Sequence, residues 1–278
     1  MKKGLYVLLT AAVLLITGCT KPYNGQYTYT AIILGDYEIV NEYAIAFPKN
    51  SPLKDPFDAI IEKMKADGTL ACLNVHYETD GDDCYESIDF TNKIYDDIDH
   101  DGGGATLKVM TSSGYPPFEY LDDEGNLAGY DIDLATFIAK ELNYQLEWVD
   151  GAFESIIVHL NQERVDFAIA AITPSPDRAE AVDFSTVYYE GAEIVLLYKE
   201  TDRYTSLSDL KNLTIAAQNG TIQAEIIENM AKDKAIKKAY FVDYPANAME
   251  ALRKHKIDAI LIEKSVADKL LETYNNTN

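Results

Sequence analysis

The sequence from Thr106 onward alternates short apolar runs with segments whose apolar residues recur at helical spacing. Val165–Ile172 is a continuous apolar run, long enough for a strand that is buried on both faces. Within Asp131–Leu142, apolar residues recur every three or four positions, as on the buried face of a helix. A second block of the same alternation begins near Leu207, and the strand-like segment Glu193–Lys199 joins the two blocks. This pattern predicts an α/β fold of two lobes with a connecting strand.

The part of the chain before Thr106 does not follow this alternation. Residues 76–105 are rich in Asp and Gly and end in Asp-Gly-Gly-Gly, which predicts a flexible acidic linker. Upstream, Tyr27–Phe47 contains two strand-like runs, and Pro56–Lys65 has a helical pattern. The remaining elements predicted after the linker are strands at Leu107–Met110, Leu213–Ala217, Tyr240–Asp243 and Ile257–Ile262, and helices at Ile156–Leu160, Ile222–Ala231, Ala246–Lys254 and Val266–Tyr274.

The first residues predict the compartment. Lys2 and Lys3 precede the apolar run Leu5–Ile16, which is too short to span a bilayer. Small residues and a lone cysteine follow, as in a bacterial lipoprotein signal, so we expect residues 1–18 to be removed and Cys19 to be acylated. The lipid would hold the protein at a membrane, extracytoplasmic, at the cell surface or in the periplasm. The alternative is an ordinary secretory signal, or an anchor helix, with an incidental cysteine.

The charge balance bears on the partners. The chain has 24 Lys and Arg against 46 Asp and Glu, a net charge of −22. Such an acidic surface repels phosphate backbones and anionic lipid, which argues against nucleic acid as a partner. The acidity says nothing about a small ligand, because most of these charges are expected on solvated faces.

Two cysteines follow Cys19, at Cys72 and Cys84. In an oxidising compartment they can pair and close a short loop. The alternative is one buried thiol and one exposed thiol. Without a cluster of Cys and His, no structural zinc site is expected.

The acidic linker contains half of a calcium motif. Asp97-x-Asp99-x-Asp101-Gly102 matches the first positions of a calcium-binding loop. The twelfth position is Lys108 instead of the bidentate Glu that such loops need. We therefore expect a solvated acidic linker here, with no metal site, and no cofactor elsewhere.

Several short motifs occur in a fixed order between Leu107 and about Tyr274. They are Tyr115-Pro-Pro-Phe-Glu-Tyr120, Gly129-Tyr-Asp-Ile-Asp-Leu134, Val165–Thr173, Arg178, Val182-Asp-Phe-Ser185 with Tyr188-Tyr189, Gly220-Thr221 and Ile257–Glu263. With these motifs the chain resembles the polar amino-acid solute-binding proteins of ABC importers, family 3. The resemblance implies a two-lobed, type II periplasmic-binding-protein-like fold, with a mixed sheet flanked by helices in each lobe. It also implies that the lobes close around a free amino acid and that the closed form docks on an ABC permease.

The order of the segments departs from that family. Family members continue past the helix corresponding to Val266–Tyr274 with a strand, a second hinge crossing and final helices on the first lobe, whereas this sequence ends at Asn278. The segments that resemble those missing pieces are Gly35-Asp36, Tyr43–Lys49 and Ala66–Thr69. They indicate a circular permutation, which is feasible because domain termini often lie close together.

The alternatives to a permutation are an unrelated extension on a truncated lobe, which would expose apolar faces, and exchange, in which residues 24–75 complete a neighbouring molecule. The permutation predicts a division of the chain into six parts. They are a signal at 1–18, the last strand of lobe 2 and the hinge at 24–42, the end of lobe 1 at 43–75, the linker at 76–105, lobe 1 at 106–196 and lobe 2 at 197–278.

The resemblance implies a site for the carboxylate of the amino acid. Arg178 corresponds to the family's carboxylate-binding arginine, whose planar fork makes paired, charge-assisted bonds. On the second lobe, a helix is expected to begin near Ile222, so the N–H groups of Thr221, Ile222 and Gln223 and the helix dipole suit the same anion. The alternatives are a surface arginine at a helix start and a simple capping turn with Thr221 as N-cap.

The ammonium group needs acceptors from both lobes. The Thr173 side chain and the Ala171 carbonyl match the family pattern on the first lobe. Glu263 stands where the family usually carries Asp, so the charge is kept but shifted by one methylene; a solvated acid at a strand end is the alternative. Tyr115 and Phe153 match the aromatic walls of the family site, where apolar contact and a cation–π contribution hold the ligand. Without the motifs, both would be read as core aromatics.

Ser112 and Gln218 bear on the class of amino acid. Ser112 stands where several relatives that bind basic amino acids or glutamine carry Asp, so a cationic side chain lacks its usual counter-ion. Gln218 is expected to face the ligand side chain and leaves a mildly polar, uncharged pocket. The expected ligand is therefore a neutral amino acid, bound by a monomer.

Two other functions share these features. A sensor of the same fold would bind its ligand in the same way and present it to a receptor. Cyclohexadienyl dehydratases also resemble this fold and use a carboxylic acid in the cleft as a general acid, a role that a desolvated Glu263 could take. The amino-acid motifs and the lipoprotein signal favour transport, so no catalytic residue is expected.

Overall fold

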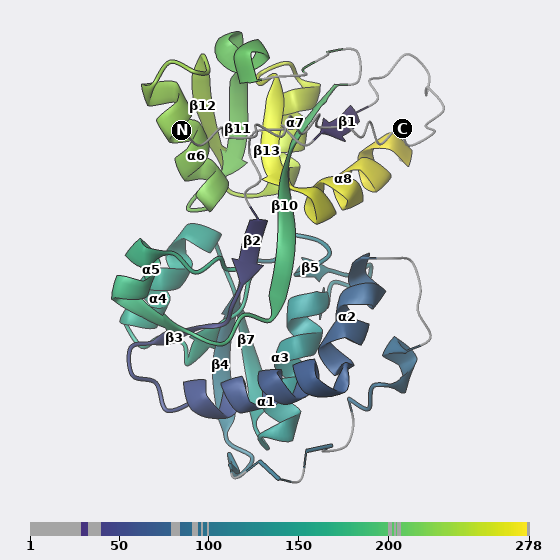
Figure 1. Ribbon diagram of the computed structural model, residues 1–278, viewed down its shortest axis with the longest axis vertical. Coiled ribbons are helices and arrows are strands. Elements are labelled where there is room, and N and C mark those ends of the chain that lie inside the picture. Colours follow the sequence, from purple (N-terminus) through teal and green to yellow (C-terminus); the bar gives the residue numbers. More distant parts are fainter. Residues whose placement is uncertain are drawn as a thin grey trace, which may run out of the picture.

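The computed structural model describes residues 29–32, 40–78, 84–90, 94–95, 97–98, 100–199, 202, 204 and 207–276. The expected signal segment 1–18 and Cys19 lie outside the described residues, as do Gly35-Asp36. The described chain forms two α/β lobes, one above the other in Figure 1. Every helix within these ranges is too short or too polar to span a bilayer.

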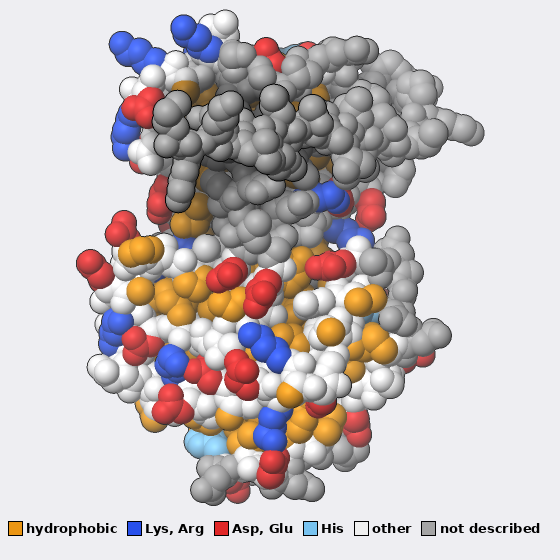
Figure 2. Space-filling model, in the orientation of Figure 1, with side chains coloured by type: hydrophobic (Ala, Val, Ile, Leu, Met, Phe, Trp, Pro, Cys, Tyr) orange, Lys and Arg blue, Asp and Glu red, His pale blue; other side chains and the backbone are white. Residues whose placement is uncertain are grey.

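The first lobe, in the lower half of Figure 1, is built on a five-stranded mixed sheet with the order β7-β4-β8-β3-β9. Its strands are β3 (Ala46–Pro48), β4 (Thr106–Thr111), β7 (Gln145–Asp150), β8 (Phe167–Ala168) and β9 (Val182–Phe184). Its helices are α1 (Lys54–Asp67), α2 (Thr69–Glu78), α3 (Tyr130–Glu141), α4 (Ile156–Asn161) and α5 (Pro176–Ala181), and the strands β5 (Tyr120–Leu121) and β6 (Leu127–Ala128) form a hairpin. On the face in Figure 2, acidic and basic side chains are interspersed over this lobe.

The first lobe packs as the helical periodicity requires. In α1, Phe57, Ile60, Ile61 and Met64 recur three or four positions apart, and all four are buried. Burying an apolar side chain of this size stabilises the fold by about 2 kcal/mol relative to leaving it exposed. The opposite face of α1 carries charged residues, so the helix lies on the lobe with one side in water.

The second lobe, in the upper half of Figure 1, has the sheet order β1-β10-β13-β11-β12. β11 (Thr214–Gln218) runs parallel to β12 (Lys238–Val242) and to β13 (Ala259–Glu263). All residues of β11 and β13 are buried, as expected for parallel strands covered on both faces. The helices of this lobe are α6 (Ile222–Lys232), α7 (Pro245–Arg253) and α8 (Lys264–Asn276).

One strand belongs to both lobes. The second half of β10 (Tyr189–Lys199) pairs with β13 and with β1 (Tyr29–Ile32), and its first half pairs with β2 (Val40–Tyr43) between the lobes. Figure 1 shows β10 and β2 side by side where the chain crosses. Pairing with β13 begins at Ile194, so the boundary predicted between residues 196 and 197 falls inside a strand that the two lobes share.

Strand β3 brings residues from before the linker into the sheet of the first lobe. Ala46 pairs with Ala168 of β8 on one side and with Phe184 of β9 on the other. Phe47 is fully buried, and its ring lies edge-on to Phe57 with 5.3 Å between the ring centroids. Without β3 the sheet would have a gap between β8 and β9, so this strand is integral to the lobe.

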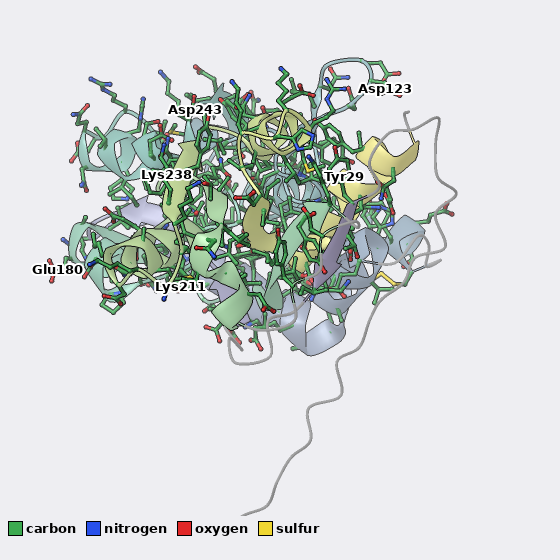
Figure 3. The ribbon with its side chains drawn as sticks, turned by 90° about the horizontal axis from the view of Figure 1, so that it is seen from above. Tyr29, Asp123, Glu180, Lys211, Lys238 and Asp243 are labelled. Atoms are coloured by element: carbon green, nitrogen blue, oxygen red, sulfur yellow. A yellow bond between two sulfur atoms is a disulfide. The ribbon has the colours of Figure 1, made fainter. Side chains whose placement is uncertain are left out.

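The first and last described segments of the chain meet on the second lobe. The N–H of Tyr29 donates to the side-chain oxygen of Asn275 at 3.1 Å, and the side-chain nitrogen of Asn275 donates to the Tyr29 carbonyl at 3.2 Å. Figure 3, seen from above, shows Tyr29 at the start of β1 beside the yellow helix α8. The two segments, which lie at opposite ends of the sequence, are therefore neighbours in space.

The apolar run Val165–Ile172 is not one strand, which corrects the prediction. Most of the run is buried, but only Phe167–Ala168 form a strand. The backbone turns at Ala171, which has a φ of +46°, and the N–H of Ala171 donates to the side chain of Asp131 at 2.7 Å. The prediction was wrong because the buried carboxylate of Asp131 accepts the N–H of Ala171. In a straight strand this N–H would donate to the neighbouring strand.

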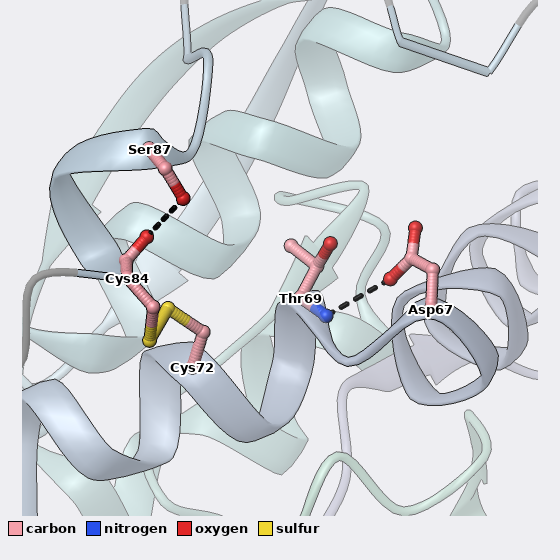
Figure 4. Close-up of a disulfide and its surroundings, with 5 residues drawn as sticks. All are labelled: Asp67, Thr69, Cys72, Cys84 and Ser87. Carbon is pink, nitrogen blue, oxygen red and sulfur yellow. Dashed lines mark hydrogen bonds between the residues drawn. A yellow bond between two sulfur atoms is a disulfide. The ribbon is translucent and has the colours of Figure 1, made fainter.

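The segment predicted as a flexible linker, 76–105, carries regular structure where it is described. Helix α2 continues to Glu78, and a short 3-10 helix spans Tyr85–Ser87. A disulfide joins Cys72 of α2 to Cys84 beside that helix (Figure 4). Of the two alternatives that the sequence left open for Cys72 and Cys84, the structure therefore has the disulfide. Residue 76, the predicted start of the linker, lies inside α2.

Two carboxylates of α3 hold the linker against the first lobe. The carboxylate of buried Glu141 accepts the N–H groups of Ile94 and Tyr95 at 2.7 and 2.8 Å. Asp133 accepts the hydroxyl groups of Tyr77, at 2.6 Å, and Tyr85. These hydrogen bonds fasten the segment to α3, so it is not merely solvated.

Replacing both linked cysteines with serine (C72S/C84S) is expected to lower the free energy of unfolding by about 3 kcal/mol. The bond closes a loop between residues separated by 12 positions, and its removal returns that conformational freedom to the unfolded chain. Urea unfolding followed by the fluorescence of the single tryptophan, Trp148, measures the change. Reduced wild-type protein should match the variant. An unchanged unfolding midpoint in both would contradict the prediction.

Candidate functional site

A small, partly open cavity lies between the two lobes. Ten of the eleven residues predicted to bind a ligand line it, five from each lobe. Those of the first lobe are Tyr115, Phe153, Ala171, Thr173 and Arg178. Those of the second lobe are Gln218, Thr221, Ile222, Gln223 and Glu263.

Ser112 is the predicted residue that does not line the cavity. It directly follows β4, is 1% exposed, and its hydroxyl has no hydrogen-bond partner among the described residues. Glu119 and Ala170, which were not predicted, line the cavity. Of the two residues on which the expectation of a neutral ligand rested, Gln218 therefore lines the cavity and Ser112 does not.

The start of α5 positions Arg178. Ser175 is the N-cap of this helix, and its hydroxyl oxygen accepts the N–H of Arg178 at 3.2 Å. The guanidinium donates to the carbonyl oxygens of Thr173 and Gly220, each at 2.6 Å, and lies 5.5 Å from the ring centroid of Phe153. Gly220 belongs to the second lobe, so Arg178 bridges the lobes. Burial lowers the pKa of Arg178, but a guanidinium remains charged at any physiological pH.

The start of α6 forms the opposite wall. Thr221 is its N-cap, and the Thr221 hydroxyl accepts the N–H of Ala224 at 3.1 Å. The N–H groups of a first helical turn have no intrahelical acceptor, and the helix dipole makes this end favourable for an anion. Gly220 precedes the cap with a φ of +76°, and a Cβ there would lie 3.0 Å from the Cα of Glu154 in the first lobe. The missing side chain thus lets the lobes meet.

Glu263, at the end of β13, places a carboxylate at the cavity from the second lobe. It is 4% exposed and accepts a hydrogen bond from the hydroxyl of Tyr115 in the first lobe. Burial raises the pKa of the Tyr43 hydroxyl well above its usual value, and the charge of Glu263 raises it further. Tyr43 lies on β2, in the part of the chain before the linker. The carboxylate of Glu263 therefore interacts electrostatically with this part of the chain as well.

Glu119 is one of the two cavity residues that sequence analysis missed, and it carries an ionisable group. It is 1% exposed, and one of its carboxyl oxygens has no hydrogen-bond partner in the described part of the chain. Gly129 makes its position possible, because a Cβ there would lie 2.3 Å from the carbonyl oxygen of Phe118. Burial raises the pKa of Glu119 well above its usual range, and the charge of Asp131 raises it further. Glu119 is part of the Tyr115–Tyr120 motif, but the motif does not say which side chain turns inward.

The two walls of the cavity carry opposite charges. The guanidinium of Arg178 and the carboxylate of Glu263 belong to different lobes, and the rings of Tyr115 and Phe153 lie beside them. The side-chain NH₂ of Gln218 donates to the Asp243 carbonyl at 2.9 Å, which fixes the orientation of its amide. The arrangement is complementary to a small molecule that carries both an anionic and a cationic group.

The calcium-like motif of the linker makes other contacts. Asp97 forms an ion pair with Lys63 at 2.6 Å, and Asp101 accepts the side-chain amide of Asn143 at 2.6 Å. Asp99 lies outside the described residues. Within the described ranges, no group of three or more His, Cys, Asp or Glu is arranged to hold a metal ion.

Residues 107–224 match the bacterial extracellular solute-binding proteins, family 3. The arginine-binding extracellular protein ArtP of Bacillus subtilis (strain 168) is 33% identical over 168 residues, which cover 60% of this chain and 65% of that protein. The ABC transporter arginine-binding protein 1 of Escherichia coli (strain K12) is 31% identical over 174 residues, which cover 62% of this chain and 70% of that protein. The chain belongs to the family 3 bacterial extracellular solute-binding proteins.

Solved structures agree with the two-lobed, type II periplasmic-binding-protein-like fold. An ancestral arginine-binding protein bound to arginine has a TM-score of 0.59 and 33% identity, over 62% of this chain and 75% of that chain. An ancestral arginine-binding protein bound to glutamine has a TM-score of 0.57 and 32% identity, over 62% of this chain and 75% of that chain. These neighbours and both curated relatives are binding proteins rather than enzymes, and the Escherichia coli relative is one of an ABC transporter. The chain matches about two thirds of the length of those relatives.

Gly220→Ala is expected to hold the lobes apart. The added Cβ meets Glu154 of the other lobe, so the radius of gyration from small-angle X-ray scattering should increase. Gly125→Ala is the matched control, because Gly125 has a similar φ of +83° with open space around it. Both changes should lower the free energy of unfolding by about 1 kcal/mol through backbone strain. Equal radii of gyration for the two variants would contradict the steric role of residue 220.

Proposed function

We propose that this protein captures a free α-amino acid between its lobes and delivers it to an ABC importer. The observation that carries the proposal is that Arg178 and Glu263, from different lobes, line one cavity. Burying a charge is costly unless it meets an opposite charge, so such a cavity favours a zwitterion over an uncharged solute. An α-amino acid presents a carboxylate and an ammonium group on neighbouring atoms.

In the proposed complex, the carboxylate of the amino acid replaces the carbonyl oxygens that the Arg178 guanidinium contacts, and it also accepts N–H groups from the first turn of α6. The ammonium donates to Glu263, to the Ala171 carbonyl and to the Thr173 hydroxyl, between the rings of Tyr115 and Phe153. Because these bonds reach both lobes, the ligand stabilises the closed arrangement relative to an open one.

We infer that the side chain of the ligand is neutral. Burial and the charge of Asp131 favour the protonated form of Glu119, so this second carboxyl group adds polarity to the cavity rather than charge. Glu119 has an unpartnered acceptor and Gln223 an unpartnered NH₂ among the described residues, and an amide side chain complements both. A basic side chain is the second candidate, since the named relatives are arginine-binding proteins and a cation beside Glu119 would favour its ionised form.

The proposal includes a lipid anchor at Cys19, an extracytoplasmic location at the membrane, a monomeric state and a permease as the partner. The lipoprotein signal at residues 1–18 supports the anchor, and membership of an extracellular solute-binding family supports the location and the permease. A ligand-sensing lipoprotein would use the same cavity but dock on a receptor. Ligand-dependent stimulation of a reconstituted permease's ATPase activity distinguishes the two.

We also infer that the chain is a circular permutation of the family order. Strand β3, from before the linker, lies in the middle of the first lobe's sheet. Tyr29 and Asn275 are hydrogen-bonded on the second lobe, as expected where two family segments were once continuous. The match to the family covers residues 107–224 and leaves the upstream segment outside.

A screen of the common L-amino acids by thermal shift and titration calorimetry tests the function. L-Glutamine is expected to raise the melting temperature, since a ligand that binds only the folded state stabilises it. Arg178→Ala should weaken the binding about 100-fold, because two charge-assisted hydrogen bonds are lost. Arg164→Ala, at an exposed arginine of the same lobe, should leave the affinity unchanged. Wild-type protein that binds none of the amino acids would refute the proposal, and preferential binding of L-arginine would favour the second candidate.

Moving residues 24–78 behind Asn278, which leaves α2 whole, tests the permutation, because it restores the family order without changing any residue of the cavity. The rearranged chain is expected to fold and to bind L-glutamine with an affinity within threefold of wild type. The same rearrangement without residues 43–49, which contain β3, should fail to fold, because the sheet of the first lobe then lacks a central strand. A rearranged chain that is unfolded by circular dichroism would contradict the permutation.

A further inference from the structure

A third carboxyl group, besides those of Glu263 and Glu119, lies directly behind the cavity wall. Asp131, in the first turn of α3, is fully buried. Its Oδ2 accepts the N–H of Ala171 at 2.7 Å, and its Oδ1 accepts the hydroxyl of Tyr188 at 2.9 Å. Both partners are donors, and an ionised carboxylate, which only accepts, satisfies them together.

Ala171 requires this support. Its φ of +46° is unfavourable for a residue that has a Cβ, and Ala171 lines the cavity. The hydrogen bond to Asp131 holds the backbone in this conformation and so sets the direction of the Ala171 carbonyl. Asp131 therefore acts on the cavity through Ala171, although it does not line the cavity itself.

Tyr188 connects the same carboxylate to the strands that cross between the lobes. The N–H of Tyr188 donates to the Tyr43 carbonyl of β2 at 2.9 Å, and the next residue, Tyr189, begins β10. The rings of Tyr43 and Tyr189 are stacked with 5.4 Å between their centroids. Asp131 thus lies between the cavity wall and the crossing strands.

Glu119 is the neighbour of Asp131 on the cavity side. Burial raises the pKa of Asp131 to about 7, and its hydrogen bonds, including one from Glu119, oppose that shift. The pKa of Glu119 is raised well above its usual range. Burial is the largest cause, and the charges of Asp131 and of Asp150, at the end of β7, add to it. Tyr130 and Tyr188 complete the titratable neighbours; burial raises the pKa of both, and the charge of Asp131 raises it further. None of these neighbours is a cation, and two adjacent buried carboxyl groups resist ionising together.

We propose that Glu119 stays protonated in the folded protein and donates this proton to Asp131, and that Asp131 is a positioning residue that holds the Ala171 carbonyl toward the ammonium group of the ligand. The proposal rests on the amino-acid-binding function proposed above. Glu119 then uses its hydroxyl for Asp131, and its second oxygen, which has no partner among the described residues, remains available to an N–H of the ligand. In this role Glu119 is a neutral hydrogen-bonding group and not a counter-ion.

Two substitutions at residue 119 separate these roles. Glu119→Gln retains a neutral donor for Asp131 and an acceptor for the ligand, whereas Glu119→Leu removes both. Glu119→Leu is expected to weaken L-glutamine binding at least tenfold more than Glu119→Gln does, as the loss of hydrogen bonds to a charged group predicts. Glu147→Gln, at an exposed residue of β7, is the matched control and should bind as wild type does. If Glu119→Gln weakens the binding as much as Glu119→Leu, Glu119 acts through its charge and the proposal is wrong.

The role of Asp131 predicts a particular dependence on pH. The wild-type affinity for L-glutamine should rise as the pH increases through about 7, where Asp131 ionises and becomes a full acceptor for Ala171 and Tyr188. Asp131→Asn, which has no proton to lose, should remove this rise. Dividing the two affinities at each pH cancels the titration of the amino acid itself. A variant profile parallel to that of wild type would overturn the positioning role.

A third measurement needs no ligand and so stands even if the proposed function fails. Carboxyl groups of an unfolded chain lose their protons near pH 4, whereas in the folded protein the pKa of Asp131 is raised to about 7 and that of Glu119 is raised well above its usual value. The folded state then binds more protons than the unfolded state, so this pair makes the free energy of unfolding fall as the pH rises. The melting temperature of Glu119→Gln minus that of wild type should therefore increase from pH 4 to pH 7. If the difference stays constant, and wild type at pH 6 lacks the infrared band of a protonated carboxyl group, the proposal is refuted.

Discussion

The two lobes depend on a pair of crossing strands. β10 contributes to the sheet of the second lobe with one half, and with the other half it pairs with β2 between the lobes. The ladder with β2 is irregular between Glu190 and Ala192, in the middle of the crossing. A break in a ladder is where a strand bends most easily. The relative position of the lobes is therefore set by a few backbone angles in this crossing and by the contacts that the lobes make across the cavity.

Two of those contacts are hydrogen bonds between groups that can also hold a ligand. Arg178 donates to Gly220 across the cavity, and Tyr115 donates to Glu263. A protein–protein bond and a protein–ligand bond at the same groups are exchangeable at little net cost, because each buried charge stays satisfied in both states. Behind them, Asp131 links the cavity wall to the crossing strands. The chemistry of the site and the geometry of the hinge are thus parts of one hydrogen-bonded arrangement.

Sequence patterns predicted the elements after the linker well, because the helices are amphipathic and the central strands are continuous apolar runs. They failed where a distant side chain competes with the local pattern. The run Val165–Ile172 bends because Asp131 accepts a backbone N–H from it. The acidic linker is fastened because Glu141 accepts two of its N–H groups. Neither interaction leaves a mark in the local composition, so neither could be predicted from it.

The sequence by itself determined the two-lobed α/β class and ten of the residues that line the cavity, since motifs record which residue types stand at the ends of strands and helices. Only the tertiary structure decided which side chains face inward. It placed Glu119 in the cavity wall and left Ser112 out of it, and the close approach of Gly129 to Phe118 leaves no room for a side chain at residue 129. It also decided that Cys72 and Cys84 are bonded and that β3 belongs to the first lobe. Contacts between residues far apart in the chain depend on the packing of the whole molecule, which no local pattern contains.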